Sequence, residues 1–372
     1  MKKRMKITSL VIALLLSSSL LGVQSFISFA NPDDEKEMAM EMNNGEKREL
    51  TIFNQPIVQT STKGRILTAD EYGNTMTVID TQTNRVIATT PIPYVPHNIQ
   101  ASPDEKTLWL AIIQPETQTM QGQKMKGEAW VLDADTYKRI ARIPVGAHPA
   151  HVIVTPDNKE AYITNGEDNS VSVIDTKNYK VIAEVKVGAG PHGLRPSPDG
   201  KYVAVADSQG TTVSIIDTAA KKLIKQVEVG KSPVQVGFSP DGKYLFSSVN
   251  GDNAAAVIDT QNWNLVKKIP TGVGPLQVYA TPNNKYLYVA NQNTKERPSR
   301  SVTVIDIATL QPIKTIETGT GAHGIVVTAD SKLAYVTNIY ENTISVIDVE
   351  KNEVISTIKS GAGPNGITFL QD

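Results

Sequence analysis

The sequence predicts an all-β protein, a closed seven-bladed β-propeller with four-stranded antiparallel blades. Three observations predict this fold: a hydrophobic phrase ending in aspartate occurs seven times, most copies lie 42 residues apart, and turn residues divide each repeat into four short segments. Repeats of about forty residues with four strands are typical of propeller blades. A repeat architecture also accounts for a length of 372 residues, which exceeds what one hydrophobic core usually organises.

Residues 1–30 are predicted to be a signal peptide. A basic start is followed by an apolar stretch over residues 7–21, and the sequence Ser28-Phe29-Ala30 offers a cleavage site after Ala30. The apolar stretch is short for a membrane span. We therefore expect a secreted or cell-envelope-associated protein outside the cytoplasm, with no transmembrane span in its mature form. An uncleaved N-terminal anchor is the alternative.

The mature chain is predicted to consist of a leader and a single repeat domain. Residues 31–49 are polar and rich in charged side chains, and such a composition cannot bury enough apolar surface to fold. They are expected to form a disordered polar leader. The propeller is expected to span residues 50–372.

The composition excludes several classes of function. The chain has 37 basic and 38 acidic residues, so no bulk charge attracts nucleic acid or a membrane surface, and a nucleic-acid partner is not expected. Cysteine is absent, which excludes disulfides, thiolate metal sites, cysteine nucleophiles and covalent haem attachment through thioethers.

The seven aspartates of the repeated phrase locate the blades and two insertions. Their spacings are 53, 42, 42, 42, 47 and 42 residues, and the aspartates are Asp80, Asp133, Asp175, Asp217, Asp259, Asp306 and Asp348. Because every blade has one, we expect them to bond turn backbone and not to act in catalysis. The insertions fall around residues 114–127 and 293–301, at the same hairpin of two blades. These loops are candidate contact surfaces for a protein or cell-wall partner, although neutral surface insertions fit equally well.

The fourth repeat shows how one blade is built. A first strand over residues 190–194 ends in the turn Ser197-Pro198-Asp199-Gly200, where proline presets φ and glycine accepts the left-handed conformation. Further strands are expected over residues 202–206, 211–217 and 222–229. Four strands fill the 42 residues, which leaves no room for a sizeable helix.

The two ends of the repeat region predict how the ring closes. The first repeat begins directly with a second strand at residues 65–70, whereas residues 363–369 form a first strand with nothing after it. The C-terminal strand is therefore expected to complete the N-terminal blade. This pairing removes two free sheet edges.

A short motif carries a family resemblance that covers about residues 50–372. Tyr335-Val336-Thr337-Asn338 is the tetrapeptide after which the YVTN propellers are named, and residues 162–165 and 288–291 are close variants. The chain is therefore similar to YVTN-family seven-bladed propeller repeat proteins, including lactonase-like and nitrite-reductase-type members. The resemblance implies the fold. It does not choose among the binding proteins, enzymes and haem- or copper-carrying proteins that share this fold.

All five histidines lie where a first strand begins. Alignment of the repeats at this point defines position 1, which holds His97, Ala150, His192, Val234, Leu276, His323 and Asn365. Position 2 includes Asn98 and His151, and His148 lies directly before Pro149. First strands are the innermost in a propeller, so these residues are expected to surround one mouth of the central channel. Five contiguous blades offer His or Asn there, and two offer Val and Leu.

Two interpretations of this cluster remain open. Neutral imidazoles suit Cu, Fe, Zn and Ni, so His97, His148, His151, His192 and His323 are candidate ligands of a transition metal or of the metal of a cofactor. Alternatively, repeat duplication copied a tolerated Pro-His-Gly strand start. Asn98, Asn365 and Arg195 are candidate ligand-binding residues. If position 4, where Arg195 lies, faces the channel, its guanidinium could bind an anionic group; otherwise it is a paired structural residue.

Three functions follow from these interpretations. The first is a binding protein that holds a metal or small ligand at the channel mouth. The second is a metal-dependent enzyme of oxidoreductase, lactonase or lyase type that uses the same site. The third is an interaction scaffold without a channel ligand. The sequence leaves open whether the protein is catalytic.

Overall fold

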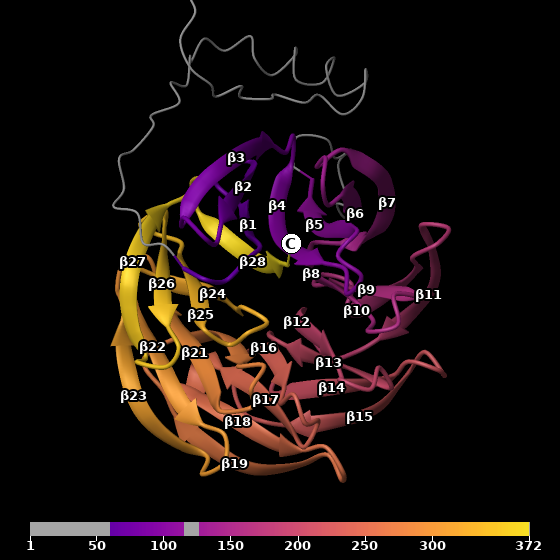
Figure 1. Cartoon of the computed structure of the whole chain (residues 1–372). Helices are drawn as coiled ribbons and strands as arrows, with labels where there is room; N and C mark the ends of the chain where they lie inside the picture. Colours follow the sequence, from indigo (N-terminus) through magenta and orange to yellow (C-terminus); the bar gives the residue numbers. More distant parts are fainter. Residues whose placement is uncertain (1–59, 115–125, 372) are drawn as a thin grey trace, which may run out of the picture.

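A computed structural model of the protein describes residues 60–114 and 126–371. These residues form seven four-stranded antiparallel sheets arranged as blades around a common axis (Figure 1). The predicted seven-bladed propeller is confirmed. The predicted signal peptide and leader, and most of the insertion around residues 114–127, lie outside the described residues.

The blades are numbered in the order of the repeated phrase, and their strands are given from the axis outward. Blade 1 consists of β28 (Pro364–Leu370), β1 (Arg65–Asp70), β2 (Thr75–Asp80) and β3 (Arg85–Pro91). Blade 2 consists of β4 (Val95–Ala101), β5 (Thr107–Ile113), β6 (Lys126–Asp133) and β7 (Arg139–Ala147). Blade 3 consists of β8 (Pro149–Val154), β9 (Glu160–Asn165), β10 (Ser170–Asp175) and β11 (Lys180–Lys186).

The remaining blades follow the same order. Blade 4 consists of β12 (Pro191–Pro196), β13 (Tyr202–Asp207), β14 (Thr212–Asp217) and β15 (Lys222–Glu228). Blade 5 consists of β16 (Pro233–Phe238), β17 (Tyr244–Val249), β18 (Ala254–Asp259) and β19 (Asn264–Pro270). Blade 6 consists of β20 (Pro275–Ala280), β21 (Tyr286–Asn293), β22 (Pro298–Asp306) and β23 (Gln311–Glu317). Blade 7 consists of β24 (Ala322–Val327), β25 (Leu333–Asn338), β26 (Thr343–Asp348) and β27 (Glu353–Lys359).

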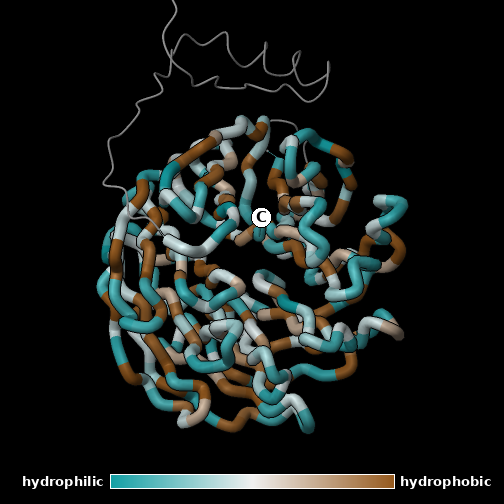
Figure 2. The backbone as a smooth tube through the Cα atoms, viewed as in Figure 1, coloured by the Kyte–Doolittle hydropathy of each residue, from teal (hydrophilic) through white to brown (hydrophobic). Residues whose placement is uncertain are grey.

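The hydrophobic core lies between blades. The second and third strands of each blade are buried on both faces, whereas outer strands such as β15 are mostly exposed. One cluster joins Ile153 and Tyr162 of blade 3 to Leu194 and Val203 of blade 4. Apolar segments accordingly recur in every blade (Figure 2). In the described residues the only helix is the short 3-10 helix η2 (Asn250–Asp252), and no helix there is long and apolar enough to cross a membrane.

The ends of the chain close the ring as predicted. Strand β28 pairs antiparallel with β1, with Leu370 opposite Arg65 and Ile367 opposite Thr68. It also packs beside the inner strands β4 and β24 of the neighbouring blades. The N-terminal and C-terminal segments thus form one blade (Figure 1).

The repeated aspartates bond turn backbone, as the sequence predicts. Asp217 Oδ1 accepts the backbone N–H of Ala220 at 2.7 Å, and Asp348 Oδ1 accepts that of Lys351 at 3.0 Å. Equivalent bonds form at Asp80, Asp133, Asp175, Asp259 and Asp306. An Asp that caps its own turn is a structural residue.

The tetrapeptide of blade 7 links adjacent parts of the ring. The buried Tyr335 hydroxyl donates to Asn84 Oδ1 of blade 1 at 2.7 Å. Thr337 Oγ1 accepts the backbone N–H of Gly324 at 2.7 Å, and Asn338 Nδ2 donates to hydroxyls of the next strand. The motif therefore recurs because each of these side chains bonds a specific neighbour.

The insertion around residues 293–301 lengthens a hairpin. Strands β21 and β22 have 8 and 9 residues, and Asn293 pairs with Pro298 beyond the usual end of the ladder. This hairpin lies at the end of the blade where inner strands begin, because position 1 neighbours the end of the second strand.

Candidate metal centre at one mouth of the channel

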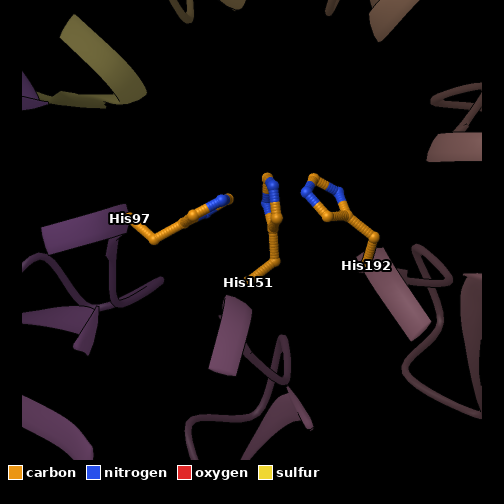
Figure 3. Close-up of side chains that lie close together, drawn as sticks. All are labelled: His97, His151 and His192. Atoms are coloured by element: carbon orange, nitrogen blue, oxygen red, sulfur yellow. The ribbon is translucent and has the colours of Figure 1, made fainter. Parts of the chain in front are cut away.

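Three imidazoles converge from three consecutive blades. His97 belongs to β4, His151 to β8 and His192 to β12. One ring nitrogen from each lies within 4.8 Å of the others, and the ring centroids are 4.9 to 5.8 Å apart. The three side chains extend from neighbouring inner strands toward one another (Figure 3).

A β-bulge at the start of the inner strands helps to aim these side chains. The register of β12 against β13 shifts between Pro191 and Leu194, and β8 shifts equivalently against β9. A bulge adds a residue to one strand and changes the direction of the side chains beside it. His97 and His192 from position 1 therefore meet His151 from position 2.

Thr164 fixes the backbone of two of the three histidines. Its Oγ1 accepts the backbone N–H of His151 at 3.0 Å and donates to the carbonyl of His192 at 2.8 Å. One hydroxyl therefore joins blades 3 and 4 at the cluster. Sequence reasoning did not assign this role, although Thr164 is the third residue of a YVTN-type tetrapeptide.

Two of the imidazoles have a defined tautomer. His97 Nδ1 lies 3.0 Å from the Ala150 carbonyl, and His192 Nδ1 lies 3.2 Å from the Val234 carbonyl. A carbonyl only accepts, so both Nδ1 atoms donate a proton. Each neutral ring then carries its lone pair on Nε2, and a hydrogen bond from the other ring nitrogen to a carbonyl is what orients metal-binding histidines.

The third imidazole is held by an amide. His151 is fully buried, its Nε2 has no hydrogen-bond partner, and its Nδ1 lies 3.4 Å from Gln235 Nε2. Gln235 Oε1 accepts the N–H of Val236 at 2.9 Å, which sets the orientation of the amide. His151 Nδ1 is therefore the acceptor, and the neutral ring carries its proton on a buried Nε2.

Gly193 allows this amide to approach the cluster. A Cβ atom added to Gly193 would lie 2.2 Å from Gln235 Oε1 and 2.7 Å from the Val234 carbonyl. The residue after His192 is glycine because the inner strand of blade 5 passes too close for any side chain.

All three imidazoles are held neutral. Burial lowers the pKa of His97 to about 4 and that of His192 to about 3, and neighbouring imidazoles act in the same direction. Burial, followed by the charge of His192, keeps the pKa of His151 well below its usual range. Neutral imidazole is the form that binds metal ions.

The other candidate residues surround this triad without joining it. His323 is buried with Nδ1 2.8 Å from Gln292 Oε1, and burial lowers its pKa to about 3. His148, the residue before β8, has a φ of 52° and a half-exposed side chain, with Nδ1 4.0 Å from Glu167. The Asn98 side-chain oxygen accepts the N–H of Val152 at 3.3 Å, so Asn98 connects two inner strands.

A carboxylate that sequence reasoning missed lies near this mouth. Asn365 Nδ2 donates to Glu71 Oε2, and Asn365 Oδ1 is buried without a hydrogen bond. Burial raises the pKa of Glu71. Its position in the turn between β1 and β2, at the end of the blade where inner strands begin, is the sequence signal that could have identified it.

Arg195 does not belong to the triad, although its positive charge helps to lower the pKa of His151. It lines a cavity together with the other residues at position 4, and none of the five histidines lines that cavity. Position 4 therefore faces the channel, and the guanidinium and the imidazoles occupy different levels along it.

Comparisons with known proteins agree with the fold. A family model described as a YNCE-like beta-propeller matches residues 123–372. Among curated proteins, none matches the chain. Lactonase-like and haem-associated propellers are among the similar solved structures, which is compatible with the YVTN resemblance.

Three solved structures show the range of these relatives. Hydrazine synthase from Kuenenia stuttgartiensis has 21% identity and a TM-score of 0.64, covering 86% of this chain and 93% of its own. A 6-phosphogluconolactonase candidate from Bacteroides fragilis has 16% identity and a TM-score of 0.70, covering 84% and 99%. The dihydro-heme d1 dehydrogenase NirN has 18% identity and a TM-score of 0.59, covering 84% and 67%. Identities this low show a shared fold alone.

Proposed function

The chain belongs to the YNCE-like β-propeller family, and we propose that it is an exported binding protein that holds one transition-metal ion on His97, His151 and His192. The observation that carries this proposal is the convergence of three ring nitrogens within 4.8 Å from three separate blades. Residues brought together from neighbouring repeats by the packing of blades around the axis are placed by the fold, and not by one local turn.

Binding an ion would require the three ring nitrogens to move closer together. Nitrogen ligands at about 2.0–2.1 Å from a tetrahedral metal lie roughly 3.3 Å from one another. The three nitrogens are within 4.8 Å of one another, so they must move closer by up to about 1.5 Å, and ligation through His151 Nε2 also requires the ring proton to move to Nδ1. Three histidines leave a fourth position for water or a ligand in the channel.

The chemistry of the ligands limits the metal. Three neutral imidazoles suit Zn, Cu, Fe and Ni, and Cu(II) is generally bound most tightly among the divalent ions of this series. The Nδ1–H groups of His97 and His192 already donate to backbone carbonyls, as the second ring nitrogen of a metal-binding histidine usually does. The export part of the proposal rests on the sequence of residues 1–30, and N-terminal sequencing of the protein released by cells tests it.

Metal binding is tested by equilibrium dialysis of untagged protein against Zn²⁺ or Cu²⁺, with the bound metal counted by mass spectrometry. We expect about one ion per chain, and we expect His97→Ala and His192→Ala each to weaken binding by at least about tenfold. His148→Ala is the matched control, because His148 is half-exposed outside the triad, and it should keep full stoichiometry. No bound metal, or equal affinity in wild type and His97→Ala, would overturn the proposal.

A further inference from the structure

The end of the channel away from the imidazoles opens into a cavity of about 620 Å³. It is lined by the ends of the inner strands and by the turns that follow them, such as Pro103, Pro156 and Pro198. Position 4 lies three residues after position 1 and two after position 2, or roughly 7–10 Å along a strand, and none of the five histidines lines the cavity. The cavity is therefore separate from the proposed metal centre, and its size is within the usual range of small-molecule pockets.

All seven blades contribute a position 4 residue to the cavity wall. The side chains are mostly apolar or small, with a few polar groups among them, and they are Gln100, Ile153, Arg195, Gly237, Tyr279, Val326 and Thr368. Phe238 and Phe369 add aromatic surface nearby. An apolar wall with a few converging polar groups is the usual form of a pocket for a small organic ligand.

Arg195 provides the one cation among the lining residues. Within the described part of the chain, its only hydrogen bond runs from Nη1 to the adjacent Leu194 carbonyl at 3.0 Å, and no carboxylate pairs with it. The only other charged residue of the lining is Glu105, which is exposed at the rim. A guanidinium has five N–H donors and stays charged at neutral pH, so most of its bonding capacity and its whole charge are uncompensated.

We propose that this cavity binds a small organic monocarboxylate. The carboxylate would accept two parallel N–H bonds from Arg195, and the apolar body would pack against Ile153, Phe238 and Phe369. One guanidinium balances one negative charge. A phosphate dianion would bring a second charge that nothing in the lining neutralises, and Glu105 would repel it.

Burial supports the need for an anion. Burial lowers the pKa of Arg195, and Tyr279 acts in the opposite direction. Arg195 is only half-buried, so this effect is partial, but a charge partly removed from water without a partner is unfavourable, and a bound carboxylate would reduce that cost. The carboxylate site uses none of the three proposed metal ligands, although the charge of Arg195 acts on His151.

Isothermal titration calorimetry with phenylacetate, phenylacetamide and phenyl phosphate tests the proposal on the wild-type protein. We expect phenylacetate to bind at least about tenfold more tightly than the neutral amide, because only the carboxylate pairs with the guanidinium. We also expect phenyl phosphate to bind more weakly than phenylacetate. Equal binding of acid and amide, or tighter binding of the phosphate, would overturn the assignment.

Variants identify the residue responsible. Arg195→Gln should weaken phenylacetate binding by at least about tenfold, while the exposed Arg85→Gln, a matched loss of one arginine, should leave it unchanged. His97→Ala should also leave phenylacetate binding unchanged, which distinguishes failure of this site from failure of the metal centre. If Arg195→Gln does not fold, the difference in affinity between phenylacetate and phenylacetamide for the wild-type protein still tests the proposal.

Discussion

The two ends of the channel are built from the same seven strands but differ in the symmetry of their chemistry. At the end where inner strands begin, three neighbouring blades supply His97, His151 and His192, while blades 5 and 6 supply Val234 and Leu276 at position 1. At the other end, one blade supplies the single cation Arg195 within a mostly apolar wall. The repeat therefore fixes the scaffold, and departures from the repeat locate the two candidate sites.

Removal of β28 should have the largest effect, because this strand reaches both ends of the channel through Asn365 and Thr368. A chain that stops after Ala362 leaves β1 with an unpaired edge and loses buried residues such as Ile367 and Leu370. We expect the melting temperature to fall by roughly 10 °C or more in calorimetry. Removal of only Gln371 and Asp372 is the control and should change little, and an equal melting temperature for the long truncation would refute ring closure.

A buried carboxyl group at the histidine end of the channel should make the stability of the protein depend on pH. Asp70, at the end of β1, takes the place of the Asn found in blades 3, 6 and 7. Burial raises its pKa to about 6, opposed by hydrogen bonds from Thr77, Thr68 and Thr75. The folded state then binds more protons than the unfolded state between about pH 4 and 6. The contribution of Asp70 to the free energy of unfolding is therefore fully present below pH 4 and is lost as the pH rises through 6.

Asp70→Asn should therefore stabilise the protein at pH 7.5 by about 1–3 kcal/mol and have little effect near pH 4. Urea unfolding at the two pH values measures the difference. The reverse variant Asn165→Asp, at the equivalent place in blade 3, should destabilise at pH 7.5. A benefit of Asp70→Asn that is equal at both pH values would show that ionisation is not its cause.

The prediction with the smallest expected effect concerns the metal centre alone. Gln235→Glu replaces the amide at His151 Nδ1 with a carboxylate that accepts a proton there, which frees the His151 Nε2 lone pair. We expect Zn²⁺ or Cu²⁺ affinity to rise about tenfold in competition with a chromophoric chelator, with phenylacetate binding unchanged. A lower metal affinity would mean that His151 does not bind through Nε2.

The fold could be predicted because each repeated residue satisfies a local bond. The aspartates cap turns, Tyr335 and Thr337 connect neighbouring strands, and the unmatched strands at the two ends can pair only with each other. These interactions depend on short sequence distances or on the repeat period, and both can be read from the chain.

The candidate sites could be predicted only in part. Alignment placed the histidines on inner strands, but the bulge between Pro191 and Leu194 breaks the alternation of side chains, so positions 1, 2 and 4 all reach the channel. Gln235 and Thr164 contact histidines of other blades, and the distance between two residues along the sequence does not predict such contacts. Glu71 lies in a turn at the histidine end of the blade, so its position could be predicted, but its contact with Asn365 is seen only in the structure.

X-ray absorption spectroscopy of the metal-loaded protein tests the central claim most directly, because it counts imidazole ligands and measures their distances. The account predicts three imidazole nitrogens at about 2.0–2.1 Å for Zn²⁺, and two in His97→Ala. A spectrum with oxygen ligands alone, or one that His97→Ala leaves unchanged, would contradict it.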